Sequence, residues 1–410
     1  MKPRLINRRD FGLGAGATGA LLAASSRFGR ARAQAAPVKI GSLLPRSGFE
    51  ALIGQECQRG IEVAKPLLKE MGYNFEVVDA DTESKPEVAR TQAERLIREG
   101  CHMLMGAYDS AQSYAIAQVA EQNSIPFVIN IGADPAITNQ GYKFVFRNFP
   151  TAIMLGNQGL QLFGEIFKAA GTTPKTAVLM HVNDSFGEAV VKGIHAYEER
   201  VGLPFKIVDE IAYSPQTNDL SVEVAKAKAA GADLHMVVTR LNDVIIMVRE
   251  MVKQKYEPQA IISPGSPGMY QSQFFKVLGK YADYTITNVC WIDPKQPMAK
   301  EFSDAFRKAY PDDIPDIDRG FIVEGLLVCA DAYKRAGSTR PEALVAALKT
   351  TAIKDRIMLG GTLSFDEHGQ NVSLPSAAVQ NIGGKPQVVL PAANAEAKLV
   401  YPVPGWTQRG

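Results

Sequence analysis

Residues 38–80 read VKIGSLLPRSGFEALIGQECQRGIEVAKPLLKEMGYNFEVVDA, and this stretch decides the fold. The runs at 38–44 and 75–80 are short and mostly apolar, which is typical of buried strands. Between them, residues 54–71 have the apolar spacing of a helix. The residues expected to face inward are Ile61, Ala64, Leu67, Leu68 and Met71. A strand, a helix and a strand in this order predict two parallel strands joined by a helical crossover.

The same alternation continues along the chain. Further strands are predicted at 103–107 and 127–131, and further helices at 86–99 and 111–123. A second series begins after Phe149 and Pro150. Its predicted strands are 176–181, 205–211, 234–239, 260–263 and 285–290, and its predicted helices are 187–201, 220–230, 243–255 and 298–310. This pattern predicts an α/β protein with two doubly wound parallel-sheet lobes.

The pattern changes after residue 310. Two more helices are predicted at 319–336 and 341–351, followed by strand-like runs at 362–365, 377–381 and 388–390. Gly383 and Gly384 separate the last two runs and indicate a hairpin. We therefore assign 34–149 and about 315–360 to an N-terminal lobe, and 150–314 and about 361–390 to a C-terminal lobe. Residues 391–410, with Pro402 and Pro404, are expected to form an extended surface tail.

The first 33 residues have the three parts of an export signal. A basic start ends in Arg8 and Arg9, an apolar run covers 12–24, and Ala31-Arg32-Ala33 provides a small-residue cleavage site. The apolar run is too short to span a bilayer about 30 Å thick. The paired arginines followed by Phe11 indicate the twin-arginine (Tat) route and an extracytoplasmic, periplasmic location. The alternative is an uncleaved N-terminal anchor.

No cofactor or metal is expected. Residues 14–19, GAGATG, match a dinucleotide-binding pattern, but they follow no strand and lie inside the export signal. The four cysteines, Cys57, Cys101, Cys290 and Cys329, are too far apart for a short zinc motif, and we expect buried thiols. The five histidines are scattered without metal-binding spacing.

The charge balance argues against nucleic acid and anionic membranes as partners. The chain has 45 basic and 43 acidic residues, for a net charge of +2. Residues 1–33 hold seven of the basic residues and one of the acidic ones, so the remainder carries −4. A mildly acidic surface without basic patches offers no binding surface for nucleic acid or for an anionic membrane.

Ligands of open parallel sheets bind beyond the C-terminal ends of the strands. The loops at these ends, if the predicted strands are right, are 45–49, 108–111, 131–134, 183–187, 240–242 and 264–269. Two lobes whose loops face each other would form a cleft. Tyr108 directly follows a predicted strand, so we expect it to line this cleft.

Several of these loops and the segments around them carry recognisable motifs. They are IGSLLPRSG at 40–48, GIEVA at 60–64, GAYDS at 106–110, AQVAE at 117–121, IPFVI at 125–129 and NDSFG at 183–187. In this order and spacing they resemble the type I periplasmic solute-binding proteins, the leucine/isoleucine/valine-binding family of ABC importers. The resemblance implies two lobes joined by three crossovers that close on a small ligand and deliver it to a membrane permease.

The resemblance also implies which residues contact the ligand. Ser110 matches the serine that holds the ligand carboxylate, and Ala133 lies in a loop that offers backbone groups. Phe186 stands where the family often has a tyrosine over the ligand. The 263–266 loop lacks the acidic residue that often pairs with the α-ammonium of an amino acid. The full set of expected ligand-binding residues is Ser47, Tyr108, Asp109, Ser110, Gly132, Ala133, Phe186, Arg240, Gly265 and Ser266.

Arg240 follows a predicted strand of the second lobe on the cleft side. A buried guanidinium needs an anion, which the ligand or the protein must supply. If the ligand supplies it, the ligand is a carboxylate that need not carry an amine. If the protein supplies it, Arg240 pairs with Asp184 or Asp243 and does not meet the ligand.

Function is therefore expected to be capture of a small carboxylate-bearing solute by a monomeric, non-enzymatic binding protein. The solute would be a branched-chain or other hydrophobic amino acid, or an aromatic or aliphatic carboxylate. A ligand-sensing subunit with the same fold is an alternative. An exported enzyme is a weaker one, because the chain has no H-E-x-x-H motif and no G-x-S-x-G elbow.

Overall fold

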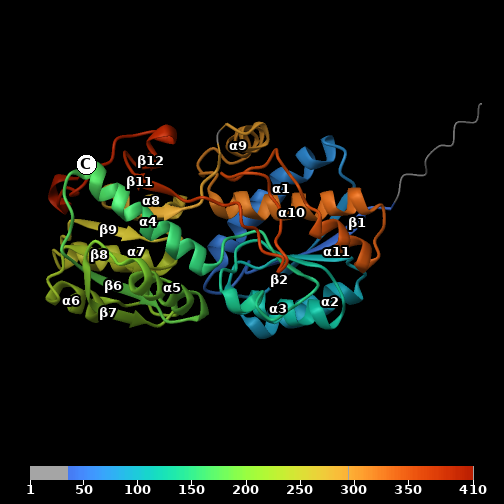
Figure 1. Cartoon of the computed structure of the whole chain (residues 1–410), viewed down its shortest axis with the longest axis horizontal. Coiled ribbons are helices and arrows are strands. Elements are labelled where there is room, and N and C mark those ends of the chain that lie inside the picture. Colours follow the sequence, from blue (N-terminus) through green and yellow to red (C-terminus); the bar gives the residue numbers. More distant parts are fainter. Residues whose placement is uncertain (1–35, 294, 410) are drawn as a thin grey trace, which may run out of the picture. The chain divides into compact units, whose positions relative to one another are not determined.

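The alternation of strands and helices is present in a computed structural model, which describes residues 36–409 except residue 294. The predicted export signal, residues 1–33, lies outside the described residues. The strands form a five-stranded and a seven-stranded sheet, each belonging to one lobe (Figure 1).

The first sheet has the order β2-β1-β3-β4-β5, and its paired strands are all parallel. The strands are β1 (Val38–Leu44), β2 (Phe75–Asp81), β3 (Met103–Gly106), β4 (Phe127–Ile129) and β5 (Val145–Arg147). Helices α2 (Pro86–Arg98) and α3 (Ser110–Gln122) pack together over a separate apolar core on one face. Helices α1 (Ala51–Glu70) and α10 (Ile317–Ala336) pack together on the other face, with α11 (Pro341–Lys349) beside α10. This arrangement is the doubly wound lobe that the sequence predicted.

The second sheet has the order β12-β11-β10-β9-β8-β6-β7. Its strands are β6 (Thr176–Val182), β7 (Lys206–Tyr213), β8 (Leu234–Val238), β9 (Ala260–Ser263), β10 (Ile286–Val289), β11 (Ala377–Asn381) and β12 (Pro386–Leu390). Its helices are α4 (Ala152–Ala170), α5 (Ser185–Val201), α6 (Ser221–Ala229), α7 (Leu241–Lys253) and α8 (Ser272–Leu278). Strands β11 and β12 form the antiparallel hairpin predicted around Gly383 and Gly384.

Three connections join the lobes, as expected for a hinge of three crossovers. They run from β5 to α4, from β10 to α9 (Pro297–Ala309), and from α11 to β11. The crossing segments hold each other through backbone bonds: Arg147 N donates to Gly369 O at 2.7 Å, and Leu359 N donates to Trp291 O at 2.8 Å. The hinge is therefore a hydrogen-bonded unit.

Several parts of the chain differ from the sequence prediction. Helices α4 and α8 and strand β5 were not predicted, and the run at 362–365 forms only isolated bridges. The tail is not a simple surface segment: Trp406 is buried, and its Nε1 donates to Tyr256 O at 2.8 Å. Burial of the large apolar surface of an aromatic ring stabilises this packed conformation of the tail.

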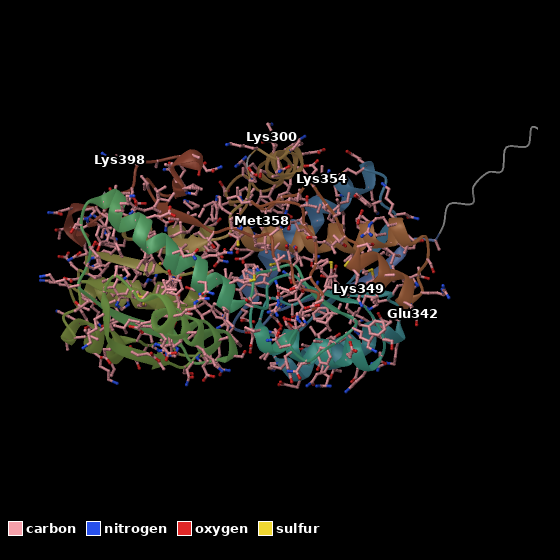
Figure 2. The ribbon with its side chains drawn as sticks, in the orientation of Figure 1. Lys300, Glu342, Lys349, Lys354, Met358 and Lys398 are labelled. Carbon is pink, nitrogen blue, oxygen red and sulfur yellow. The ribbon has the colours of Figure 1, made fainter. Side chains whose placement is uncertain are left out.

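The lobe boundaries also differ. Helix α9, which we assigned to the second lobe, packs on α1 of the first lobe. Lys300 on α9 points outward (Figure 2), whereas Phe302 and Phe306 are buried. Gln370 bridges to Arg147, so the second lobe resumes near β11 rather than at residue 361. An amphipathic pattern shows which face of a helix is buried but not which lobe covers it.

Candidate functional site

Two aspartates that cap helices converge on one arginine between the lobes. Asp109 is the N-cap of α3, and its Oδ1 accepts from Ala111 N at 2.8 Å. Asp184 is the N-cap of α5, and its Oδ1 accepts from Gly187 N at 2.9 Å. A carboxylate satisfies orphan N–H groups at the start of a helix. Each aspartate has its second oxygen left for another partner.

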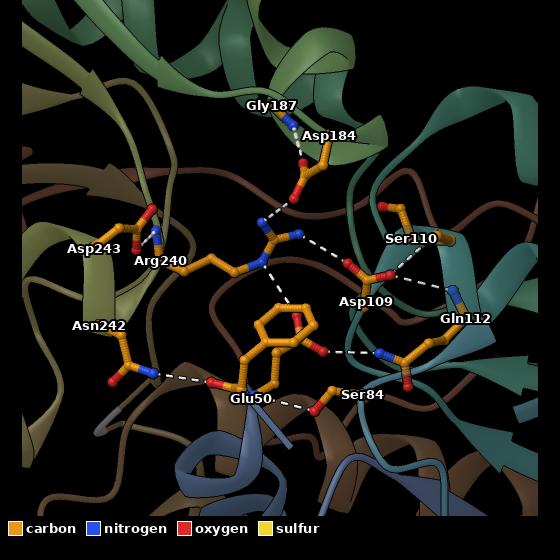
Figure 3. Close-up of polar contacts among 12 residues, drawn as sticks. Glu50, Ser84, Asp109, Ser110, Gln112, Asp184, Gly187, Arg240, Asn242 and Asp243 are labelled. Atoms are coloured by element: carbon orange, nitrogen blue, oxygen red, sulfur yellow. Dashed lines mark hydrogen bonds and ion pairs between the residues drawn. The ribbon is translucent and has the colours of Figure 1, made fainter. Parts of the chain in front are cut away.

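Arg240, the N-cap of α7, is that partner (Figure 3). Its Nη2 donates to Asp109 Oδ2 at 2.8 Å, and its Nη1 donates to Asp184 Oδ2. Its Nε lies 3.3 Å from Glu50 Oε1, and its Cζ lies 5.1 Å from the ring centre of Phe186. Glu50 and Asp109 belong to the first lobe, so this buried side chain connects the two lobes.

The charges around Arg240 are those of the protein itself. Burial alone would lower the pKa of Arg240, but Asp184, Asp109 and Glu50 raise it above its ordinary value. Burial raises the pKa of Glu50 to about 8, and the Asp109 carboxylate adds to this shift. Glu50 is therefore mostly protonated at neutral pH, and Asp109 and Asp184 balance the guanidinium.

These contacts decide between the two alternatives for Arg240. The guanidinium pairs with Asp184, as one alternative expected, and also with Asp109 of the opposite lobe. Asp243 instead accepts from the backbone N of Arg240 at 2.8 Å. The guanidinium therefore needs no ligand anion, and Arg240 gives no argument for or against an amine on the ligand.

A small cavity of about 20 Å³ lies between the lobes beside Arg240. We call it the inner pocket. Its lining is mainly apolar and aromatic, with a few polar side chains. The lining residues are Tyr108, Ser110, Ile131, Ala133, Phe149, Phe186, Arg240, Gly265, Pro267, Tyr270, Ile317 and Asp318. A volume of this size holds about one water molecule, so a larger solute requires the walls to move apart.

Ser110 supplies a hydroxyl to this pocket from the first turn of α3. Its Oγ accepts from Ala133 N at 3.2 Å and from Asp134 N at 3.3 Å. Because the oxygen accepts both bonds, its proton is left to donate. Arg147, fully buried, holds the same loop by donating from Nη1 to Gly132 O at 3.0 Å and Asp134 O at 2.8 Å.

The expected ligand-binding residues fall into three groups. Tyr108, Ser110, Ala133, Phe186, Arg240 and Gly265 line the inner pocket. Asp109 contacts Arg240. Ser47, Gly132 and Ser266 do not line the pocket.

The last three residues have other contacts. The backbone N of Ser47 donates to Asp81 Oδ1 at 3.2 Å at an exposed position. Gly132 presents its carbonyl to Arg147, and Ser266 Oγ lies 2.6 Å from Ser263 Oγ. Position in a loop at a strand end indicates proximity to a cleft, but not where a side chain or carbonyl points.

Sequence reasoning missed two acidic residues of the site. Glu50 immediately precedes α1, and Asp318 lies in the first turn of α10. Asp318 follows no strand, so the strand-end rule could not find it. A carboxylate pair at the start of a helix, Asp316 and Asp318, was the available signal.

A larger cavity of about 360 Å³ lies on another side of Arg240. We call it the outer cavity, and its walls include Phe49, Glu50 and Asn242. Asn242 Nδ2 donates to Phe49 O at 2.9 Å, which is a second contact between the lobes. Arg240 thus separates the inner pocket from this outer cavity.

Neither a metal cluster nor a membrane-crossing helix is found in the part of the chain that the structure describes. No group of three or more His, Cys, Asp or Glu side chains among these residues could hold a metal ion. No helix there is both long and apolar enough to cross a membrane. The four cysteines are free and buried.

Two sheet-based lobes with a pocket between them form an architecture that is typical of binding proteins. The family model described as "Periplasmic binding protein" matches residues 37–385, so the chain belongs to this family. Leu/Ile/Val-binding protein homolog 8 of Brucella abortus (strain 2308) is 26% identical over 380 residues, covering 89% of this chain and 93% of the relative.

Solved structures share this fold. The substrate-binding protein LivJ of the branched-chain amino acid transporter from Streptococcus pneumoniae, in complex with isoleucine, matches with a TM-score of 0.73 and 19% identity, covering 89% of this chain and 99% of that chain. A solute-binding protein of an ABC transporter from R. palustris, in complex with benzoate, matches with a TM-score of 0.74 and 20% identity, covering 90% and 97%.

Proposed function

We propose that this protein is the extracytoplasmic substrate-binding component of an ABC importer and captures a small carboxylate-bearing solute. The observation that carries the proposal is the inner pocket, which lies between the two lobes and is lined by aromatic rings and Ser110. A concave, mostly apolar site with a few placed polar groups is typical of a small-molecule site.

The carboxylate is assigned to the Ser110 side of the pocket. The hydroxyl of Ser110 donates, and the buried Arg147 guanidinium behind the 132–134 loop supports a negative charge there. Tyr108, Phe149, Phe186 and Tyr270 provide the apolar walls. The ligands named for the related structures, isoleucine and benzoate, both have a carboxylate and an apolar body.

Capture proceeds by hinge closure. The solute first meets Ser110 and Ala133 on the first lobe, and the second lobe then closes with Phe186 and Arg240 over it. Because Arg240 contacts carboxylates of both lobes, its contacts form as the lobes meet. Affinity then reflects the contacts with the ligand minus the free energy of closing.

Binding of a panel of acids tests the proposal. Hydrophobic amino acids, benzoates and aliphatic acids would be screened by thermal shift, since a ligand of the folded state raises the melting temperature. Hits would be measured by calorimetry. Ser110→Ala should weaken binding of every hit by about 1–3 kcal/mol, the value of a hydrogen bond to a charged group.

Ser185→Ala is the matched control. Ser185 also directly follows a capping aspartate, Asp184, but it does not line the inner pocket. Its substitution should leave affinity unchanged. A panel without any binder, or equal effects of the two substitutions, would contradict the proposed site.

Export by the twin-arginine route and delivery to a membrane permease complete the proposed function. The family membership and the export signal read from residues 1–33 support both. Genes for a permease and an ATPase beside the gene for this protein would favour transport over ligand sensing.

A further inference from the structure

The inner pocket has a second polar group, the carboxyl of Asp318. This side chain is 1% exposed and comes from α10, which follows the second crossing between the lobes. Its Oδ2 accepts from Gln271 Nε2 at 2.6 Å. Among residues 36–409, with 294 left out, no basic side chain lies within ion-pair distance of Asp318. Its other oxygen is available to the pocket.

The Tyr108 hydroxyl lines the same pocket and lacks a partner. Tyr108 is 4% exposed, and its OH makes no hydrogen bond with the described residues. Tyr108 and Asp318 both line the inner pocket, and the Asp318 carboxylate adds to burial in raising the pKa of the Tyr108 hydroxyl. Leaving a buried hydroxyl unpaired is costly, so a ligand group that bonds to it is favoured.

The charges behind Asp318 favour a cation. Arg319 Nη2 lies 2.7 Å from Asp313 Oδ2 and 3.3 Å from Glu56 Oε1, and its Nη1 lies 2.7 Å from Asp316 Oδ2. Arg59 also pairs with Asp313, at 3.0 Å. With Asp318, four carboxyl groups therefore face two guanidinium groups.

Burial and this excess of carboxyl groups both favour the protonated form of Asp318 when no cation is near. Burial raises the pKa of Asp318 well above its ordinary value, and the Asp316 and Glu56 carboxylates raise it further. A cation placed against the free oxygen would reverse this balance, because an opposite charge stabilises the ionised carboxylate.

We infer that Asp318 and the Tyr108 hydroxyl form a subsite for a protonated amine of the ligand. The inference rests on the proposed function, which places the ligand carboxylate at Ser110. The ammonium donates to Asp318 Oδ1 and to the Tyr108 oxygen, and the carboxylic proton of Asp318 passes to solvent. Charge is conserved: the ligand ammonium keeps its three protons, and one proton is released for each molecule bound.

The test compares acids that differ only in the amine. L-leucine is paired with 4-methylpentanoate, and L-phenylalanine with 3-phenylpropanoate. Calorimetry in two buffers of different ionisation enthalpy reports both affinity and proton release. We expect the amine-bearing member of at least one pair to bind at least ten-fold more tightly at pH 7 than the member without the amine. Its binding should release close to one proton per molecule bound.

Three variants separate the roles of the pocket residues. Asp318→Asn should abolish both the amine preference and the proton release. Tyr108→Phe should reduce the preference several-fold, and it keeps the fold because it removes only an unpartnered hydroxyl. Ser110→Ala should weaken both members of a pair equally and leave the proton release intact.

The outcomes distinguish this subsite from the proposed function. If the acids bind but the amine confers no advantage, or if Asp318→Asn keeps that advantage, the subsite is wrong and the pocket stands. If 4-hydroxybenzoate is preferred over benzoate in an Asp318-dependent way without proton release, the subsite takes a neutral hydroxyl and the amine assignment is wrong. If no acid binds, the proposed function fails as well. If the melting temperature of Asp318→Asn lies far below that of the wild type, the amine preference of Tyr108→Phe and the proton release of the wild type test the subsite instead.

Discussion

Replacing Arg240 by alanine should open the ligand-free protein. The substitution removes the guanidinium that joins Asp109 of the first lobe to Asp184 of the second. It also leaves two carboxylates facing each other in a buried place. Removing one partner of a buried ion pair costs about 3–5 kcal/mol. At about 1.4 kcal/mol per factor of ten, the ratio of open to closed forms should rise roughly 10²- to 10⁴-fold.

A distance between the lobes measures this change. Lys85 and Gln216 are exposed residues on opposite sides of the outer cavity, so spin labels at Lys85→Cys and Gln216→Cys would report on its width by pulsed EPR. The native cysteines are buried, which favours labelling at the introduced positions. We expect Arg240→Ala to add a population at longer distance than the wild type.

Asp243→Asn is the control for this experiment. Asp243 contacts the backbone of Arg240 and the Tyr213 hydroxyl, both in the second lobe, so it makes no bond across the cleft. This variant should lose stability without changing the distance distribution. An unchanged distribution in Arg240→Ala, or the same opening in Asp243→Asn, would refute the reasoning.

Three further results are expected. The pKa of Glu50 in the folded protein, about 8, lies above its ordinary value of 4.5, so the stability that Glu50 contributes is present below pH 4.5 and is lost as pH rises through 8. The melting temperature of Glu50→Gln should therefore fall less between pH 5 and 8 than that of the wild type. Trp406→Ala should lower the free energy of unfolding by about 3–5 kcal/mol in denaturant titrations, because it leaves a cavity at a buried position in the second lobe. An effect below about 1 kcal/mol would mean that the tail is not part of the core. Replacing Arg8 and Arg9 by lysine should retain the protein in the cytoplasm in fractionation experiments, whereas undiminished export would indicate another route.

Much of the fold could be predicted from local patterns. The strand at 260–263 and the Gly383-Gly384 hairpin were placed correctly, because short apolar runs and paired glycines act through nearby backbone geometry. Helix α4 was missed because glycines interrupt its pattern. Gly159 is needed there for a close approach, since a Cβ would lie 2.3 Å from Pro264 O.

The site was predictable only in part. Ser110 and Phe186 follow strands, so topology alone brought them to the cleft. Asp184 was one of the two partners predicted for Arg240, but Asp109 was not, because it lies 131 positions away and meets Arg240 only across the lobes. Asp318 lies in the segment at about 315–360 that the sequence assigned to the first lobe, but it follows no strand, so its place in the pocket was not predicted.

The shared use of Asp109 restricts how this cleft can change in evolution. One oxygen starts a helix and the other binds Arg240. A substitution of Asp109 that weakens the contact between the lobes therefore also removes the N-cap of α3, the helix that carries Ser110. New ligand preferences are more accessible through Ile317 and Tyr270, which line the inner pocket but make no ion pair between the lobes.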